Sequence, residues 1–248
     1  MSDEVPEGVL SVVIPTFNEE STLGAILERV LEQKMVGEII VVDDGSTDAT
    51  AKVATEWVGR EAKIKFVEHE ANQGKGAALR TGFESATLPY VIVQDADMEY
   101  DPLDFQRVIE PLAADEADVV YGSRYLKKDP RNVMRFWHTM GNRFLTLLSN
   151  MLSDLHVTDM ETCYKGFRRE VIQAIPIEEN RFGFEPEVTA KVAKMKLRVM
   201  ETSVHYYPRS YHEGKKIGWK DGVRAIWCIV KYNVFVRKPI TWQKVESK

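Results

Sequence analysis

Cysteine is scarce in this sequence. Only two cysteines, Cys163 and Cys228, occur among the 248 residues, and neither belongs to a C-x-x-C pair. Disulfide-rich domains and cysteine-based zinc sites need several cysteines at short spacings. Both classes are therefore excluded, and we expect the chain to work in a reducing compartment, the cytoplasm.

Long apolar runs and an excess of basic residues are missing as well. The nearest approach to a membrane span, residues 225–236, is interrupted by Lys231 and Asn233, whereas a spanning helix needs about 20 mostly apolar residues. The first residues, MSDEVPEGVL, have neither a basic start nor an apolar run, so no secretory signal is predicted. The chain has 33 basic against 38 acidic residues, a net charge of −5, which argues against a nucleic-acid partner.

The composition that remains is that of a globular protein. Hydrophobic residues make up 44% of the chain and charged residues 29%, which excludes disordered and collagen-like classes. A chain of this length can bury one large core. We therefore expect residues 1–248 to form a single domain.

The first half of the chain alternates short apolar runs with segments of helical periodicity. Strands are expected at residues 9–15, 38–43, 64–68, 90–94 and 118–121. Helices are expected between them, at residues 21–33, 48–57, 76–86 and 103–112. This alternation is typical of an α/β fold with a mainly parallel central sheet flanked by helices.

The second half changes character. At residues 135–155, apolar side chains recur at helical spacing beside Arg135, Trp137, His138 and Arg143. An amphipathic helix of this kind packs on a core or lies on a membrane surface, and we favour the core-facing interpretation. Further helices are expected at residues 170–174, 185–195 and 219–236, and a strand at 197–202.

Three of the predicted strands in the first half end in polar clusters. The clusters are PTFNEE at residues 15–20, DDGSTD at 43–48 and DADME at 95–99. In an open parallel sheet, ligands bind beyond the carboxyl ends of the strands. We therefore expect the three clusters to converge on one crevice.

The third cluster is a candidate metal site. Asp95, Asp97 and Glu99 occupy alternate positions directly after an apolar strand, and carboxylate oxygens suit a hard divalent cation such as Mg²⁺. Because Mg²⁺ usually takes one or two carboxylates and completes its shell with water and phosphate oxygens, Asp97 is expected to be the main ligand, supported by the other two. The alternative is a surface turn with solvated carboxylates.

Two other segments are candidates for nucleotide contact. Asp44 follows a second acid at the buried end of a strand, where its carboxylate suits a base N–H or a ribose hydroxyl. The segment NQGKG at residues 72–76 lacks the spacing of a P-loop and the third glycine of a dinucleotide fingerprint. Its Lys75 either contacts a phosphate or belongs to a flexible approach to the next helix.

Five segments, PTFNEE, VVDDGSTDAT, NQGKGAALRTG, QDADMEYD and YGSRY, together resemble the family 2 inverting glycosyltransferases of the GT-A fold. The branch that acts on polyprenyl (dolichyl-type) phosphate is the most similar, and the resemblance covers roughly residues 10–220. It implies a nucleotide-diphospho-sugar transferase that uses Mg²⁺ or Mn²⁺ to move a hexose from a UDP- or GDP-sugar to a polyprenyl monophosphate. Residues 1–125 would bind the nucleotide sugar and residues 126–248 the acceptor.

The resemblance also assigns roles to residues. The nucleotide-sugar site would contain Pro15, Phe17, Glu19, Asp44, Lys75 and Asp95. The metal would be held by Asp95, Asp97 and Glu99. The donor or acceptor phosphates would be met by Arg124, Lys165, Lys215 and Lys216. The candidates for catalysis itself are Asp97, Asp159, Arg124 and Lys165.

The loop TDMET, residues 158–162, departs from the family pattern. It keeps the acid at Asp159, but Glu161 replaces a small or hydroxyl residue that is common in the mannosyl branch, so the identity of the sugar stays open. A hydroxyl acceptor, soluble or on a polysaccharide, would need a carboxylate base, for which Asp159 is the candidate. A dianionic lipid phosphate would attack without one.

A lipid acceptor has consequences for the partners of the chain. It would bring residues 135–155 to the cytoplasmic face of a membrane, by direct contact or through a separate membrane-anchored subunit. A second copy of the chain is the other partner considered. The alternative outside enzymology is a nucleotide-binding module without catalysis, which the intact acidic cluster at residues 95–99 opposes.

Overall fold

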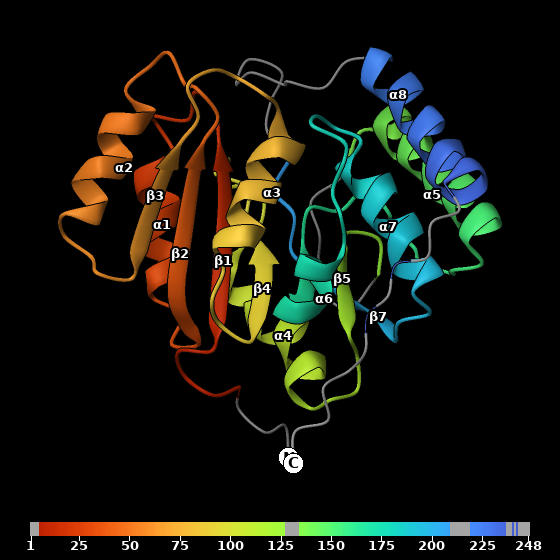
Figure 1. The fold of residues 1–248 in the computed structure, drawn as a ribbon, viewed down its shortest axis with the longest axis horizontal. Coiled ribbons are helices and arrows are strands. Elements are labelled where there is room, and N and C mark those ends of the chain that lie inside the picture. The colour runs from red at the N-terminus through yellow and green to blue at the C-terminus, as the bar shows by residue number, and fades with distance from the viewer. Residues whose placement is uncertain (1–4, 127–133, 209–218, 237–239, 241, 243–248) are drawn as a thin grey trace.

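The structure is a computed structural model that describes residues 5–126, 134–208, 219–236, 240 and 242. Within these residues one sheet of seven strands has the order β3-β2-β1-β4-β6-β5-β7 (Figure 1). The strands are β1 (Leu10–Thr16), β2 (Val36–Asp43), β3 (Ile64–Glu68), β4 (Tyr90–Val93), β5 (Val119–Ser123), β6 (Lys165–Arg168) and β7 (Val199–Ser203). β6 runs antiparallel to β4 and β5, whereas the other neighbouring pairs are parallel. The predicted α/β fold with a mainly parallel sheet is confirmed.

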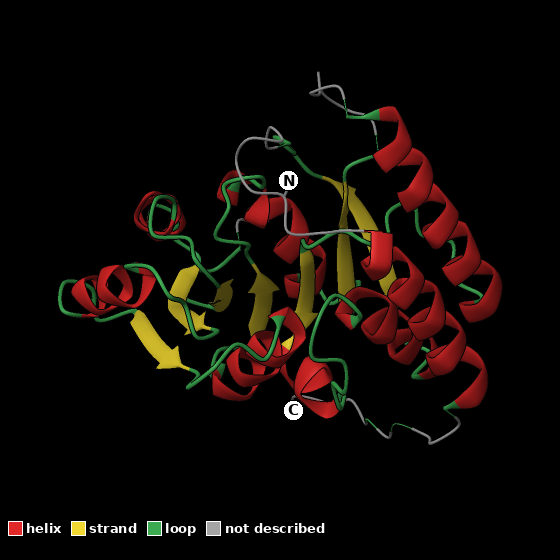
Figure 2. Cartoon of the chain, turned by 90° about the horizontal axis from the view of Figure 1, so that it is seen from above, coloured by secondary structure: helices red, strands yellow, loops and turns green. Residues whose placement is uncertain are grey.

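Helices lie on both sides of the sheet, as Figure 2 shows from above. They are α1 (Leu23–Leu31), α2 (Thr50–Val58), α3 (Lys75–Ser85), α4 (Phe105–Ala113), α5 (Phe136–Ser153), α6 (Arg169–Ala174), α7 (Phe184–Lys194) and α8 (Trp219–Val230). A 3₁₀ turn, η1 (Pro102–Asp104), precedes α4, and a π-helical turn, η3 (Lys231–Phe235), continues α8. None of the described helices is both long and apolar enough to cross a membrane.

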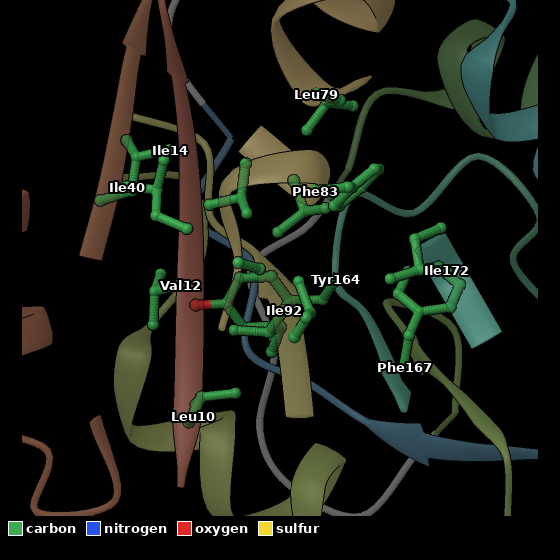
Figure 3. Packing of buried hydrophobic residues seen from close by; sticks show 14 of the residues in the cluster. Leu10, Val12, Ile14, Ile40, Leu79, Phe83, Ile92, Tyr164, Phe167 and Ile172 are labelled. Atoms are coloured by element: carbon green, nitrogen blue, oxygen red, sulfur yellow. The ribbon is translucent and has the colours of Figure 1, made fainter. Parts of the chain in front are cut away.

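The central strands are mostly apolar and almost fully buried, as expected for parallel strands covered on both faces of the sheet. Val12 and Ile14 of β1 pack with Ile92 of β4 and with Leu79 and Phe83 of α3 in one core (Figure 3). β2 is likewise buried almost throughout. This core fixes the carboxyl ends of the parallel strands relative to one another.

β6 is absent from the sequence-based prediction. It has only four residues, Lys165–Arg168, and its sequence KGFR shows no apolar alternation. The strand forms because it fits between β4 and β5, where Gly166 lets the side chains of α4 approach closely. Its antiparallel direction brings the amino end of β6 to the same edge as the carboxyl ends of the parallel strands.

α5 corrects the expectation of a core-facing helix. Its buried side chains are polar, namely Asn142, Thr146 and Ser149. Its exposed face carries the large apolar residues Phe136, Trp137, Met140, Phe144, Leu147 and Met151. The helical spacing was recognised from the sequence, but the apolar stripe points away from the protein. α8 packs beside α5 at the β7 end of the molecule (Figures 1 and 2).

Candidate active site

The polar clusters after β1 and β2 interlock at the carboxyl edge of the sheet. The backbone N–H of Asn18 donates to Ser46 Oγ at 2.9 Å, and that of Glu19 donates to Thr50 Oγ1 at 2.8 Å. The carboxylate of Glu19 accepts a hydrogen bond from Thr22 at the start of α1. Pro15 and Phe17 are half-buried in the same segment.

Asp44, at the end of β2, fixes the segment that leads into α3. Its Oδ1 accepts the N–H of Gln73 at 2.9 Å, and its Oδ2 accepts the N–H of Gly74 at 2.6 Å. His69 Nδ1 is hydrogen-bonded to Oδ1 at 2.8 Å. Most of the carboxylate is thus engaged by the protein, and a contact with a base or ribose stays a prediction. Sequence reasoning did not identify His69, because a lone histidine after a strand carries no signal.

Lys75 links the start of α3 to the acidic motif after β4. Its Nζ lies 3.0 Å from Asp95 Oδ1 and 3.4 Å from Glu185 Oε1 of α7. Burial opposes the charged form, but the carboxylates of Asp95 and Glu185 outweigh it and raise the pKa of Lys75 well above its ordinary value. Lys75 is therefore a fixed cation at this edge. Glu185 was missed, since nothing in its helical segment distinguishes it from a surface acid.

The other two acids of the motif have different surroundings. The N–H of Glu99 donates to Asp97 Oδ1 at 3.1 Å across Met98, which has a left-handed φ of 62°. The carboxylate of Glu99 accepts the hydroxyl of Tyr206 at 2.8 Å. In the described part of the chain, no three acidic, histidine or cysteine side chains gather as metal ligands. A centre built from all three predicted carboxylates is thus not preformed.

The donor set still suits a divalent cation held by fewer protein ligands. Asp95 and Asp97 offer carboxylate oxygens at the end of β4, and both are only half-buried. Mg²⁺ and similar cations accept one or two carboxylates when substrate phosphates complete the shell. These two carboxylates are therefore of the kind that a divalent cation binds, and Asp97 as the main ligand stays a prediction.

Arg124 and Asp159 form a buried ion pair at the end of β5. Arg124 Nε and Nη2 donate to the two oxygens of Asp159 at 2.7 and 2.8 Å. Burial disfavours the Asp159 carboxylate, but Arg124 holds its pKa below the ordinary value. The guanidinium also lies over the ring of Tyr206, 5.2 Å from its centroid. Tyr206 therefore joins Arg124 to Glu99 of the acidic motif.

Lys165 is fully buried at the start of β6. Its Nζ donates to the carbonyl oxygens of Met160, at 2.9 Å, and Thr162. Burial lowers the pKa of this ammonium. The structure thus gives Lys165 a partner other than a phosphate, and its predicted phosphate contact would require it to leave both carbonyls. Lys215 and Lys216 lie outside the described residues.

Known proteins are similar to this chain over most of its length. Residues 11–175 match the sequence pattern described as glycosyl transferase family 2. The chain is 31% identical to a dolichyl-phosphate beta-glucosyltransferase of Drosophila melanogaster, over 99% of this chain and 82% of that protein. It is 30% identical to a dodecaprenyl-phosphate galacturonate synthase of Rhizobium johnstonii, over 95% of this chain and 70% of that protein.

A solved structure shares the fold. Glucosyl-3-phosphoglycerate synthase from Mycobacterium tuberculosis, in complex with Mn²⁺, UDP and glucosyl-3-phosphoglycerate, superimposes with a TM-score of 0.71 at 20% identity. The match covers 91% of this chain and 80% of that one. The match over residues 11–175 and the 31% identity to the Drosophila melanogaster protein show that the chain belongs to the glycosyl transferase family 2 and is a glycosyltransferase, and its fold is the GT-A fold of the solved structure.

Proposed function

We propose that this glycosyltransferase moves a hexose from a UDP- or GDP-sugar to a polyprenyl monophosphate and inverts the configuration at the sugar. The observation that carries the proposal is the meeting of Lys75, Asp95 and Arg124 at one edge of the sheet, with Tyr206 between Arg124 and the acidic motif. The relatives named above act, by their names, on dolichyl and dodecaprenyl phosphates. Residues 1–125 would hold the donor, and residues 126–248 the acceptor.

Charge at this edge suits a diphosphate donor. Asp97, with Asp95 beside it, would hold the divalent cation, Mg²⁺ or Mn²⁺, which when bound offsets the charge that grows on the leaving diphosphate. Lys75 and Arg124 are cations already fixed by the protein. Pro15, Phe17 and Glu19 would line the nucleoside pocket beyond β1. Asp44 would shape that pocket through the loop that it holds.

The state of Asp159 favours a phosphate acceptor over a hydroxyl. Both of its oxygens are paired with Arg124, and its pKa is lowered, so it is a weak proton acceptor. A lipid monophosphate has a second pKa of about 6 and is mostly dianionic at neutral pH. Its oxygen forms the new bond to the anomeric carbon while the bond to the diphosphate oxygen breaks on the opposite face, and no protein base is needed.

The outward face of α5 supports contact with a membrane. Trp137 is 82% exposed and Phe144 56% exposed, and exposed Arg135 and Arg143 flank this apolar stripe. The sequence from Arg135 to Ser153 contains no acidic residue. Such a helix lies in the headgroup region of anionic bilayers. We place it at the cytoplasmic face, where a lipid-linked phosphate is within reach.

One matrix of assays tests the proposal. UDP- and GDP-sugars are combined with polyprenyl phosphate or with soluble sugar hydroxyls, in the presence of Mg²⁺, Mn²⁺ or a chelator, and labelled product is measured. We expect a lipid product from one donor class that disappears with the chelator. Transfer to hydroxyls alone would overturn the acceptor assignment. Metal-independent nucleotide binding without transfer to any acceptor would indicate a binding module instead.

A further inference from the structure

Glu161 lies in the loop between Asp159 and β6, at the edge of the sheet where the candidate site lies. The charged groups that act on it are Glu185 of α7, Lys165 of β6, Arg124 after β5, and Asp159. In the sequence, Glu161 is distinguished only by its replacing a small or hydroxyl residue. Its surroundings in the fold indicate a role in binding.

The neighbouring charges are paired without Glu161. Asp159 is held by Arg124 at 2.7 Å, and Glu185 by Lys75 at 3.4 Å. The ammonium of Lys165 donates to the backbone carbonyl oxygens of Met160 and Thr162, the residues before and after Glu161. Among the described residues, the buried Oε1 of Glu161 has no hydrogen-bond partner.

A charge count indicates which form of Glu161 this cluster accepts. Of the charged groups that act on Glu161, Lys165 and Arg124 supply two positive charges, and Glu185 and Asp159 supply two negative ones. An ionised Glu161 would be an unmatched anion beside Glu185. Burial, and then the charge of Glu185, raise the pKa of Glu161 to about 8. The neutral acid is thus the form with the lower cost.

A neutral carboxylic acid offers one O–H donor and one carbonyl acceptor. A phosphate oxygen could accept from the O–H but would leave the buried Oε1 without a donor. A sugar hydroxyl both donates and accepts, so it pairs with either group. The ligand chemistry that fits Glu161 is therefore a neutral polyol and not an anion.

We propose that Glu161 is carried as the neutral acid and binds a hydroxyl group of the transferred sugar, which makes it a residue that selects the sugar. This inference rests on the proposed function, because it assumes that the sugar of the donor reaches the edge where Lys75 and Arg124 lie. The inference adds to the proposed function the group that binds the sugar, the carboxyl of Glu161, and the protonation state of that group.

Two variants separate the neutral acid from a general base. E161Q keeps a donor and an acceptor but never ionises, whereas E161A removes both. E170Q, at an exposed position in α6, is the control. We expect E161Q to retain kcat/KM within about threefold and E161A to bind the sugar nucleotide about tenfold more weakly. Calorimetry compares the affinity for UDP with that for UDP-glucose, and the affinity for GDP with that for GDP-mannose. The affinity for UDP or GDP alone should be the same in both variants as in wild type.

The pH dependence provides a readout that does not involve turnover. A carboxyl with a folded pKa of about 8 holds its proton where the unfolded chain, near 4.5, has lost it. As the pH rises between these two values, the unfolding free energy of wild type should therefore fall relative to that of E161Q. The melting temperature of wild type should drop further below that of E161Q from pH 5 to pH 8.5.

Either of two results would overturn the inference. One is an E161Q variant that loses as much kcat/KM as E161A does, which would mean that the ionised carboxylate is required. The other is normal binding of the sugar nucleotide by E161A. If wild type transfers no sugar to any lipid phosphate, the proposed function fails, while the binding comparison still tests Glu161 separately.

Discussion

The guanidinium of Arg124 holds the carboxylate of Asp159 through two hydrogen bonds of 2.7 and 2.8 Å, deep in the protein. The backbone N–H of Arg124 adds a third bond at 3.0 Å, and Asn142 Nδ2 of α5 adds a fourth at 3.0 Å. The carboxylate therefore joins the end of β5 to the polar inner face of α5. The main effect of the carboxylate is to fix the position of Arg124. Because its oxygens accept these hydrogen bonds, it is poorly suited to accept a proton.

Asp159→Asn tests this relationship. The substitution leaves a buried guanidinium without its counterion, and breaking such a pair costs about 3 kcal/mol or more of unfolding free energy. We expect a clear fall in melting temperature and a drop in kcat of about tenfold, because Arg124 is less well positioned. Asp154→Asn, at an exposed left-handed position that asparagine tolerates, is the control. A loss of turnover by about a thousandfold at unchanged stability would instead identify Asp159 as a base.

Much of the donor edge could be predicted from the sequence. The clusters after β1, β2 and β4 were assigned to one edge because strong apolar periodicity identified their strands and parallel pairing follows from the alternation with helices. The sequence predicts a role for Lys75 and for Asp95 separately, and the structure pairs them.

The acceptor half was harder to predict for physical reasons. Periodicity tells which residues of α5 share a face, but not whether protein or another phase covers that face. β6 and the burial of Lys165 depend on contacts between segments far apart in the chain. Glu179 carries no signal in the sequence, because its partners Arg224 and Tyr232 lie far along the chain, in α8 and η3.

Glu179 connects the last helix to the start of α3. Its carboxylate, 4% exposed, accepts from Arg224 Nε at 3.1 Å, Lys231 Nζ at 3.0 Å and the hydroxyl of Tyr232 at 2.9 Å. Burial opposes ionisation, but these donors lower the pKa of Glu179 to about 2. Because the folded pKa is depressed, the stabilisation is present above about pH 4.5 and is lost as the pH falls toward 2.

We therefore expect Glu179→Gln to destabilise the protein by on the order of 3 kcal/mol at pH 7 and by little near pH 2.5. Denaturant titrations at several pH values measure the difference. Glu178→Gln, with a half-exposed side chain, should change stability far less. Equal losses for Glu179→Gln at both pH values would show that packing, not charge, accounts for the effect.

Asp97 and Glu99 should respond differently to neutralisation. Glu99 is engaged by Tyr206, whereas Asp97 is expected to be the main protein ligand of the cation. We predict that Asp97→Asn weakens the Mn²⁺-dependent part of UDP or GDP binding by about a hundredfold and that Glu99→Gln weakens it by less than tenfold. Calorimetry with and without Mn²⁺ measures both. The reverse order would assign the cation to Glu99.

Two glycines test the close contact near Lys75. A Cβ at Gly76 of α3 would overlap the carbonyl oxygen of Glu179, whereas one at Gly141 of α5 would meet nothing within 4 Å. Gly76→Ala should therefore cost about 2 kcal/mol of unfolding free energy. It should also weaken donor binding, because the start of α3 carries Lys75. Gly141→Ala should stabilise by about 0.5 to 1 kcal/mol, since alanine is the better helix former. Chemical denaturation compares the pair, and a neutral Gly76→Ala would contradict the packing described.

The outward face of α5 gives the last prediction. Phe144 and Leu147 are 56% and 59% exposed, so replacing both with glutamate removes apolar area without opening the core. We expect the Phe144→Glu, Leu147→Glu variant to keep its melting temperature within about 2 °C. Its co-sedimentation with vesicles that contain anionic lipid should fall at least tenfold, because two apolar side chains are lost and two negative charges face the headgroups. Val58→Glu, in α2 at the far end of the molecule (Figure 1), serves as the control. Vesicle binding equal to that of wild type would contradict the placement of α5 on the membrane. If the helix only docks the enzyme on the membrane, the variant should still turn over a water-soluble short-chain polyprenyl phosphate.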